Sequence, residues 1–207
     1  MPKLDSNLSS RFQQQLHFII EIDKVKQIIR QTLLMDSSKQ ENDAEHSWHM
    51  AVTLFVLAEY ANEKYLDLIK AVKMVLIHDL VEIDAGDTYA YDENAHHDKD
   101  EREQKAAKRI FGLLPDDLRI EFTQIWEEFE AGETAEAKFV GAIDRFMPIL
   151  HNYKTNGKQW LKHGVTADTV LKRNNPVKEG SETLWNEVLR MVDDARRKGY
   201  LLNGPKK

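Results

Sequence analysis

The feature that most constrains this 207-residue chain is the spacing of its apolar residues, which recur at intervals of three and four along most of its length. That period matches one face of an α-helix. No segment alternates strictly between apolar and polar residues, as a half-buried strand does. The sequence therefore predicts an all-α fold with no sheet of consequence.

Residues that start or stop helices bound several of the expected elements. Asp43 is suited to cap a helix that begins there, and Thr134 to cap another that runs to about residue 150. Gly132 ends the helix before it. Pro148 falls inside the later pattern, so we expect it to kink that helix or end it early. The other expected helices span about 16–34, 65–81, 100–111, 115–129, 167–172 and 180–198.

One stretch, residues 84–100, has no helical stripe and is expected to be a long loop. Long loops within compact domains are usually functional or mobile. This loop contains His96 and His97. The two histidines are interpreted either as ligands of a second metal ion or as solvated loop residues.

Length and composition favour one domain. The chain is 42% hydrophobic, and a domain holds about 150 residues. No apolar run approaches the roughly 20 residues that span a bilayer, and the N-terminus lacks the apolar core of a signal peptide. The chain has no cysteine, which excludes disulfides and thiolate metal sites. We expect a cytoplasmic protein, although the lack of cysteine also fits an exported one.

The charge balance is 29 Lys and Arg against 35 Asp and Glu, a formal net charge of −6. An acidic chain lacks the general basic face that nucleic acids and anionic membranes attract. We therefore expect neither as a partner. A small anionic substrate stays possible, because one bound cation inverts the local field.

Three separated segments carry residues suited to a divalent metal ion. The first holds His46, the second holds the adjacent pair His78 and Asp79, and the third holds Asp144 inside an apolar helical pattern. An ionised carboxylate in apolar surroundings costs several kcal/mol unless it is paired or bound to metal. Imidazole nitrogen and carboxylate oxygen without sulfur suit Mn, Fe, Co, Ni or Zn.

Each piece also has a purely structural interpretation. A lone helical histidine is usually a core or surface residue, Asp79 is suited to cap the next segment, and Asp144-Arg145 is suited to be half of a surface ion pair. Taken one at a time, these interpretations are the better ones. The three segments together, in this order and context, favour a metal site.

The order His46, His78-Asp79, Asp144 resembles the H…HD…D signature of the HD superfamily of metal-dependent phosphohydrolases. Two phrases are similar to those of the subfamily that includes the bacterial 5′-deoxynucleotidases and oxetanocin-like HD proteins: Glu-Asn-Asp-Ala-Glu-His-Ser and Ile-His-Asp-Leu-Val-Glu-Ile-Asp-Ala-Gly-Asp-Thr. The resemblance implies an HD-domain helical bundle. It implies a single HD domain over residues 1–207, with a metal-binding core at about 25–153 and C-terminal helices at 166–199 packed on it.

The resemblance also implies roles for individual residues. One divalent ion (Mn, Co, Fe, Ni, Zn or Mg) would be held by His46, His78, Asp79 and Asp144. Glu82 and Asp87 would be the catalytic carboxylates, with the division of labour between them left open. Arg30 would bind the phosphate group, the alternative being an exposed helical arginine.

The implied reaction is hydrolysis of the phosphate monoester of a (deoxy)nucleoside 5′-monophosphate through a metal-activated water. The implied assembly is a homodimer. Two alternatives stay open: a nucleotide-binding module with little turnover, and an HD hydrolase of another phosphoester. Gln31 stands where the deoxynucleotidases have a tryptophan, which leaves the sugar preference open. His49 is interpreted as a neighbour of the metal ligands or as a core histidine.

Overall fold

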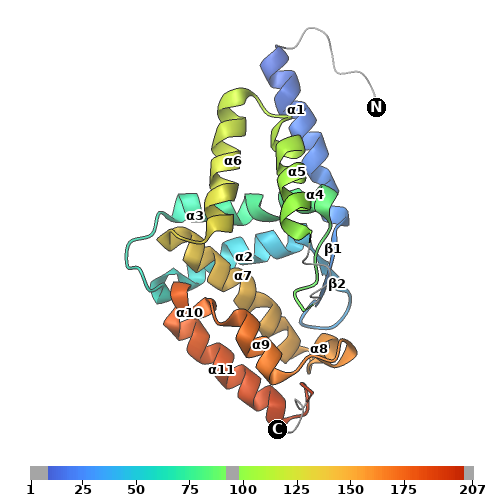
Figure 1. Ribbon diagram of the computed structural model, residues 1–207, viewed down its shortest axis with the longest axis vertical. Helices are drawn as coiled ribbons and strands as arrows, with labels where there is room; N and C mark the ends of the chain where they lie inside the picture. The colour runs from blue at the N-terminus through green and yellow to red at the C-terminus, as the bar shows by residue number, and fades with distance from the viewer. Residues whose placement is uncertain (1–8, 92–97, 203–207) are drawn as a thin grey trace.

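The computed structural model describes residues 9–91 and 98–202, most of which lie in helices (Figure 1). The predicted all-α class is therefore confirmed. The α-helices are α1 (Ser10–Ile22), α2 (Asp43–Leu57), α3 (Leu68–Ile77), α4 (Glu82–Ala85), α5 (Lys99–Phe111), α6 (Asp116–Ala131), α7 (Ala135–Lys154), α8 (Lys158–Lys162), α9 (Ala167–Asn174), α10 (Val177–Gly180) and α11 (Glu182–Arg197). Three 3-10 segments join them: η1 (Asp23–Gln27), η2 (Ala58–Tyr60) and η3 (His78–Val81).

The expected helix over residues 16–34 is wrong in its second half. Helix α1 ends at Ile22, and the chain then forms β1 (Ile29–Leu33), which pairs antiparallel with β2 (Gln40–Asn42). Apolar spacing does not reveal this hairpin, because Val25, Ile28 and Ile29 continue the helical spacing of the preceding segment, although Ile29 is 51% exposed. Backbone hydrogen bonds to a segment ten residues away override the local pattern. The hairpin places Arg30 on a strand.

Helix α2 begins where the sequence predicts, but its cap is Asn42 and not Asp43. Asn42 Oδ1 accepts a hydrogen bond from the Glu45 N–H at 2.9 Å, and Glu45 Oε2 accepts one from the Asn42 N–H at 3.1 Å. This reciprocal capping box satisfies the free donors of the first turn. The Asp43 side chain is therefore not needed as a cap, and it is completely buried.

Helix α7 passes through Pro148 and ends at Lys154, so the expected early end is wrong. Its start follows the prediction: Gly132 ends α6 at a φ of 62°, and Thr134 caps α7 by accepting from the Ala137 N–H. Neighbours surround α7, which contacts α2, α3, α6, α10, α11 and β1. Tertiary packing thus holds the helix together where proline removes one backbone donor. Asp144 lies on this central helix.

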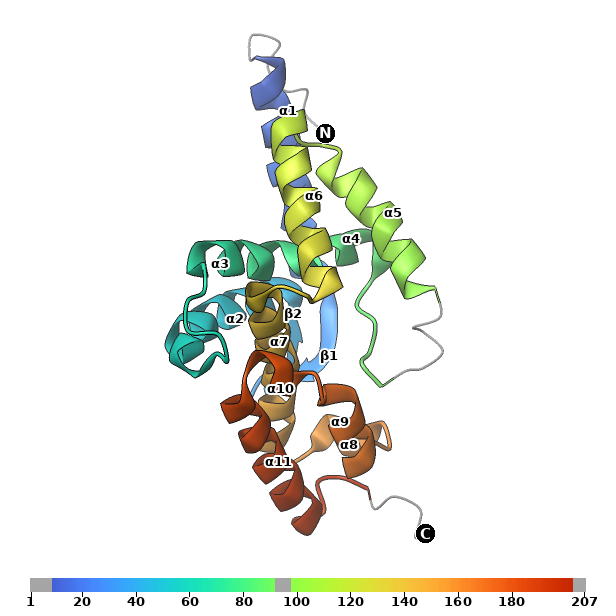
Figure 2. The same cartoon turned by 60° about the vertical axis from the view of Figure 1, so that its left-hand side comes forward.

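The elements follow one another along the long axis of the molecule. Helices α1, α5 and α6 lie at one end, α2, α3 and the hairpin lie next to them, and α8 to α11 lie toward the other end (Figures 1 and 2). Helix α10 packs against the N-terminal half of α7. In the C-terminal third, Trp160, Leu184 and Val188 are buried as expected of packing residues, whereas Leu161 and Leu189 are about two-fifths exposed. Among residues 9–91 and 98–202, no helix is both long and apolar enough to cross a membrane.

Candidate metal centre

The four residues predicted as metal ligands converge from three elements. His46 lies on α2, His78 and Asp79 begin η3, and Asp144 lies on α7. Asp144 Oδ1 is 3.1 Å from His46 Nε2 and 3.9 Å from His78 Nε2, and Asp79 Oδ1 is 3.1 Å from His78 Nε2. Ligand atoms of the two histidines and Asp79 all lie within 4.8 Å of one another. A single cation can therefore reach this set after small side-chain adjustments.

The two imidazoles are oriented as metal ligands are. His78 Nδ1 donates to the Val75 carbonyl at 2.8 Å, which leaves the buried Nε2 without a hydrogen-bond partner. His46 Nδ1 lies 3.4 Å from Glu41 Oε2. Metal-ligating histidines usually donate the other ring N–H to a carbonyl or a carboxylate. The residues present thus fit a divalent ion.

The charges in this cluster depend strongly on one another. Burial and nearby Arg30 act to lower the pKa of His46, but hydrogen bonds to Asp144 and Glu41 outweigh them and raise it to about 9. Burial acts to raise the pKa of Asp144, but His46 and His78 lower it overall. The carboxylates thus favour a positive charge at the point where these side chains meet. A protonated imidazole can carry that charge in the metal-free protein, and a bound metal cation can carry it otherwise.

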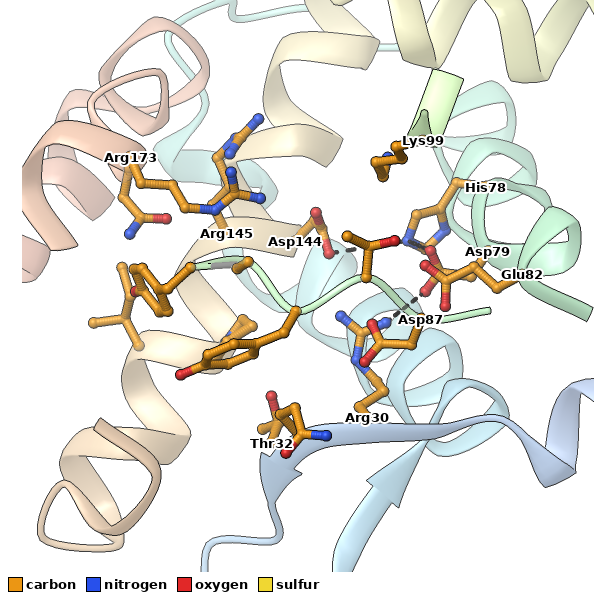
Figure 3. A pocket seen from close by; sticks show the side chains of 18 of the residues that line it. Arg30, Thr32, His78, Asp79, Glu82, Asp87, Lys99, Asp144, Arg145 and Arg173 are labelled. Atoms are coloured by element: carbon orange, nitrogen blue, oxygen red, sulfur yellow. Dashed lines mark hydrogen bonds and ion pairs between the residues drawn. The ribbon is translucent and has the colours of Figure 1, made fainter. Parts of the chain in front are cut away.

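Glu82 and Asp87 line the same cavity as His78, Asp79 and Asp144 (Figure 3). Glu82 opens α4 and is only 7% exposed; burial first, and then Asp79, raise its pKa well above the usual range. Burial likewise raises the pKa of Asp87, in the loop after α4. One oxygen of Glu82 has no hydrogen-bond partner in the described structure. Both carboxyl groups therefore hold a proton more readily than an exposed carboxylate does.

Arg30 lines this cavity from β1, so its interpretation as an exposed helical arginine is wrong. Its Nη1 lies 2.9 Å from Asp79 Oδ2 and 3.2 Å from Asp43 Oδ1. Burial acts to lower the pKa of Arg30, but the surrounding carboxylates, Asp79 first, raise it well above the usual value. The guanidinium is therefore a permanent cation beside the centre.

Sequence reasoning missed Asp43 as a member of this site. Burial first, and then nearby Asp79, raise the pKa of Asp43 to about 7. Asp43, Asp79 and Glu82 form a second group of carboxylates with ligand atoms within 4.8 Å of one another. The sequence does contain an indication that Asp43 belongs to the site, because Asp43 precedes His46 by three residues and lies on the same face of the helix.

Sequence reasoning also missed two cavity arginines, Arg145 and Arg173 (Figure 3). Burial lowers the pKa of Arg173, and nearby Arg145 lowers it further. Within the part of the chain that the structure describes, no carboxylate lies at ion-pair distance from either guanidinium. The interpretation of Asp144-Arg145 as half of a surface ion pair is therefore wrong, because the described hydrogen-bond partner of Asp144 is the buried His46. The cavity has two cations available for an anion.

Of the other candidate residues, Gln31 lines the cavity, whereas His49, Lys154 and Lys158 are not among its lining residues. His49 is partly buried beside His151, with ring centroids 5.6 Å apart. Lys154 and Lys158, two basic residues that follow Asp144 in the chain, are solvent-exposed. His96 and His97 lie outside the described residues.

Comparisons with known proteins place the chain in a family. The model of the HD domain matches residues 22–185. A crystal structure of a predicted metal-dependent phosphohydrolase from Magnetospirillum magnetotacticum MS-1 is 52% identical, with a TM-score of 0.89, and the match covers 94% of this chain and 97% of that one.

Two curated relatives carry the name 5′-deoxynucleotidase. The human protein HDDC2 is 33% identical over 136 residues, which are 65% of this chain and 65% of that protein. The Vibrio cholerae protein is 26% identical over 172 residues, 78% of this chain and 88% of that protein. The chain spans slightly less than two thirds of the length of the mammalian relatives. The resemblance seen in the sequence is confirmed, and the chain belongs to the HD domain family.

Proposed function

We propose that this protein is a metal-dependent phosphohydrolase that releases phosphate from nucleoside 5′-monophosphates. The observation that carries the proposal is the convergence of His46, His78, Asp79 and Asp144 on one point of a cavity that Glu82 and Asp87 also line. The names of the relatives support a phosphate monoester of a nucleotide as the substrate.

The four converging residues would hold one divalent ion. Their nitrogen and oxygen donors suit Mn, Co, Fe, Ni, Zn or Mg, and elemental analysis of purified protein would identify the native metal. When bound, such an ion lowers the pKa of water and neutralises charge on the phosphoryl group.

The two cavity carboxyl groups divide the proton transfers. As water attacks phosphorus, Glu82 takes or relays the water proton while the bond from phosphorus to the ester oxygen breaks. Asp87 positions the nucleophile or donates a proton to the departing alkoxide. Burial raises the pKa of each group, and a carboxyl group whose affinity for a proton is increased is suited to proton transfer, which supports these roles.

Three arginines would bind the phosphate. Asp79 and Asp43 anchor Nη1 of Arg30, which leaves the rest of its planar fork to contact non-bridging oxygens. Arg145 and Arg173 have no carboxylate partner among the described residues, so they are free to neutralise the remaining charge of the substrate.

We also propose that the chain is a single HD domain over residues 1–207, with its metal-binding core at about 25–153, and that two copies form a cytoplasmic homodimer. An exposed apolar stripe on α2 supports the dimer: Trp48, Val52, Phe55 and Val56 are each 45% exposed or more. Their spacing puts them on one helical face, and an apolar patch of this kind is typical of an interface. Light scattering should give twice the chain mass, and Phe55→Glu should give a monomer.

A substrate screen tests the proposed reaction. Nucleoside 5′-monophosphates with ribose and with deoxyribose are incubated with metal-stripped protein, alone and with Mn²⁺, Co²⁺ or Mg²⁺. Metal-dependent release of phosphate is expected, and activity in the stripped protein would contradict the proposal. Tight nucleotide binding without release would instead indicate a binding module. Release only from another phosphoester would identify a different substrate.

A further inference from the structure

Another group of potential metal ligands, separate from the proposed centre, lies on the side of His46 that carries Nδ1. It consists of Glu41 on β2, His49 on α2 and His151 on α7, and one ligand atom from each lies within 4.8 Å of the others. Glu41 and His151 are each 2% exposed, and His49 is partly exposed. The group shares no residue with the four proposed ligands of the first centre.

The ring of His151 is prepared for a cation in the same way as that of His78. His151 Nδ1 lies 2.8 Å from the Leu33 carbonyl, to which it donates. The neutral ring therefore carries its lone pair on Nε2, and that atom is buried with no hydrogen-bond partner in the described structure. An unsatisfied buried acceptor destabilises the fold, and a bound cation would satisfy it.

Glu41 supplies the negative charge of the group. Its Oε2 lies 3.4 Å from His46 Nδ1 and 3.9 Å from Arg30 Nε. A carboxylate has about four acceptor positions, so these contacts leave capacity for a metal ion. Because two imidazoles and one carboxylate are a common donor set for zinc, the chemistry of the group matches a transition metal and not Ca²⁺ or Mg²⁺.

His49 supplies the route by which an ion would enter. Its ring centroid lies 6.1 Å from that of Trp48 and 5.6 Å from that of His151. Trp48 is 67% exposed and His49 itself is partly exposed, so the group reaches solvent through His49. The other two residues are buried, on elements that α2 contacts.

We propose that Glu41, His49 and His151 bind a second divalent transition-metal ion, with zinc as the best match. The ion would join β2, α2 and α7, and it would hold Glu41 against the ring of His46. Three protein ligands leave one position of a tetrahedral site for water. The inference is independent of the proposed phosphatase activity, because it concerns only what these three side chains bind.

Metal stoichiometry tests the proposal directly. Full-length protein is loaded with Zn²⁺, freed of unbound metal and analysed for zinc per chain. We expect two equivalents in the unmodified protein, one in His151→Gln, one in His49→Gln and one in His78→Ala. The matched control His17→Gln, on the exposed face of α1, should retain two. The partly exposed His49 provides a variant with little risk of misfolding, and circular dichroism checks each protein.

A spectroscopic measurement locates the second ion. In the His78→Ala background, Co²⁺ should produce the visible absorption of a four-coordinate site, and Zn²⁺ should raise Tm. Both effects should disappear when His49→Gln is added. No zinc in the unmodified protein, or one equivalent that His49→Gln retains, would overturn the proposal. Two equivalents retained in both His49→Gln and His151→Gln would overturn it as well, since the ion would then lie elsewhere.

Discussion

Arg30 and Asp79 form an ion pair inside the cavity, with the guanidinium Nη1 2.9 Å from the carboxylate Oδ2. Each side chain is only 12% exposed. The pair connects β1 to the start of η3, and Arg30 also lies 3.2 Å from Asp43 on α2. A short strand thus helps to position a carboxylate that we propose as a metal ligand.

Arg30→Ala should destabilise the metal-free protein. The substitution leaves Asp43 and Asp79 without a cationic partner, and breaking a buried ion pair on one side typically costs about 3–5 kcal/mol. Urea unfolding measures the change, and Arg30→Lys should recover part of it. The control is Arg11→Ala, which removes an exposed ion pair with Asp117 and should have little effect. Equal effects of the two alanine variants would contradict this view of Arg30.

His78→Ala should remove the metal of the first centre and the phosphatase activity together. Loss of residues that merely orient metal ligands typically costs 10- to 100-fold, so loss of a ligand should exceed about 100-fold. The loss should be seen in phosphate release at saturating Mn²⁺ or Co²⁺. His17→Ala, an exposed histidine on α1, is the control and should match the unmodified protein. Retained activity in His78→Ala would show that His78 is not a ligand of the catalytic metal.

Glu82→Gln should separate metal binding from turnover. The amide keeps the shape of the side chain but cannot accept the proton of the attacking water, and loss of general base catalysis typically costs about 10²- to 10⁴-fold. Metal content should be unchanged while kcat falls. The exposed Glu59→Gln, on η2, should change neither quantity. Normal kcat in Glu82→Gln would leave Asp87 as the base.

Arg173→Ala should weaken substrate binding more than it slows the chemistry. Arg173 lines the cavity with Arg145 and has no described carboxylate partner, so its loss removes one cation from the cavity that we propose binds phosphate. We expect KM to rise by about 10- to 100-fold, since one charged hydrogen bond is worth about 1.5–3 kcal/mol. Arg173→Lys should recover part of the affinity. An unchanged KM would place the phosphate away from this arginine.

The stability of the metal-free protein should depend on pH through Asp43. Burial and nearby Asp79 raise its pKa from 3.8 in the unfolded chain to about 7 in the folded one. Between these values the folded state holds more protons, so the contribution of this group is present below pH 4 and is lost as the pH rises to 7. Asp43→Asn should remove this part of the decrease in stability with rising pH, because asparagine does not titrate.

Urea unfolding at pH 4.5, 5.5, 6.5 and 7.5 compares Asp43→Asn with the unmodified protein. The difference between their free energies of unfolding should change steadily across this series. Asp117→Asn is the matched control, because Arg11 lowers the pKa of Asp117 to about 2, outside the range tested. A constant difference between Asp43→Asn and the unmodified protein would show that Asp43 does not titrate in this range.

The sequence predicts helices and helix ends correctly where interactions within one turn of the chain determine them. Thr134 caps α7 and Gly132 ends α6 as predicted, because each acts through the backbone of its own turn. The cap of α2 was assigned one residue late, since Asn42 and Asp43 are both suited to it and only the reciprocal bonds with Glu45 distinguish them. The strand with Arg30 was missed, because its partner lies on a later segment.

By itself the sequence determined the helical class and singled out His46, His78, Asp79 and Asp144, because apolar period and residue order are properties of the chain. Tertiary structure alone decided that these side chains meet at one point and that Asp43 and Arg30 lie beside them. It also brought Arg173 into the cavity from the C-terminal third. These relationships join residues tens of positions apart, and their energies come from burial and charge that exist only after the helices have packed.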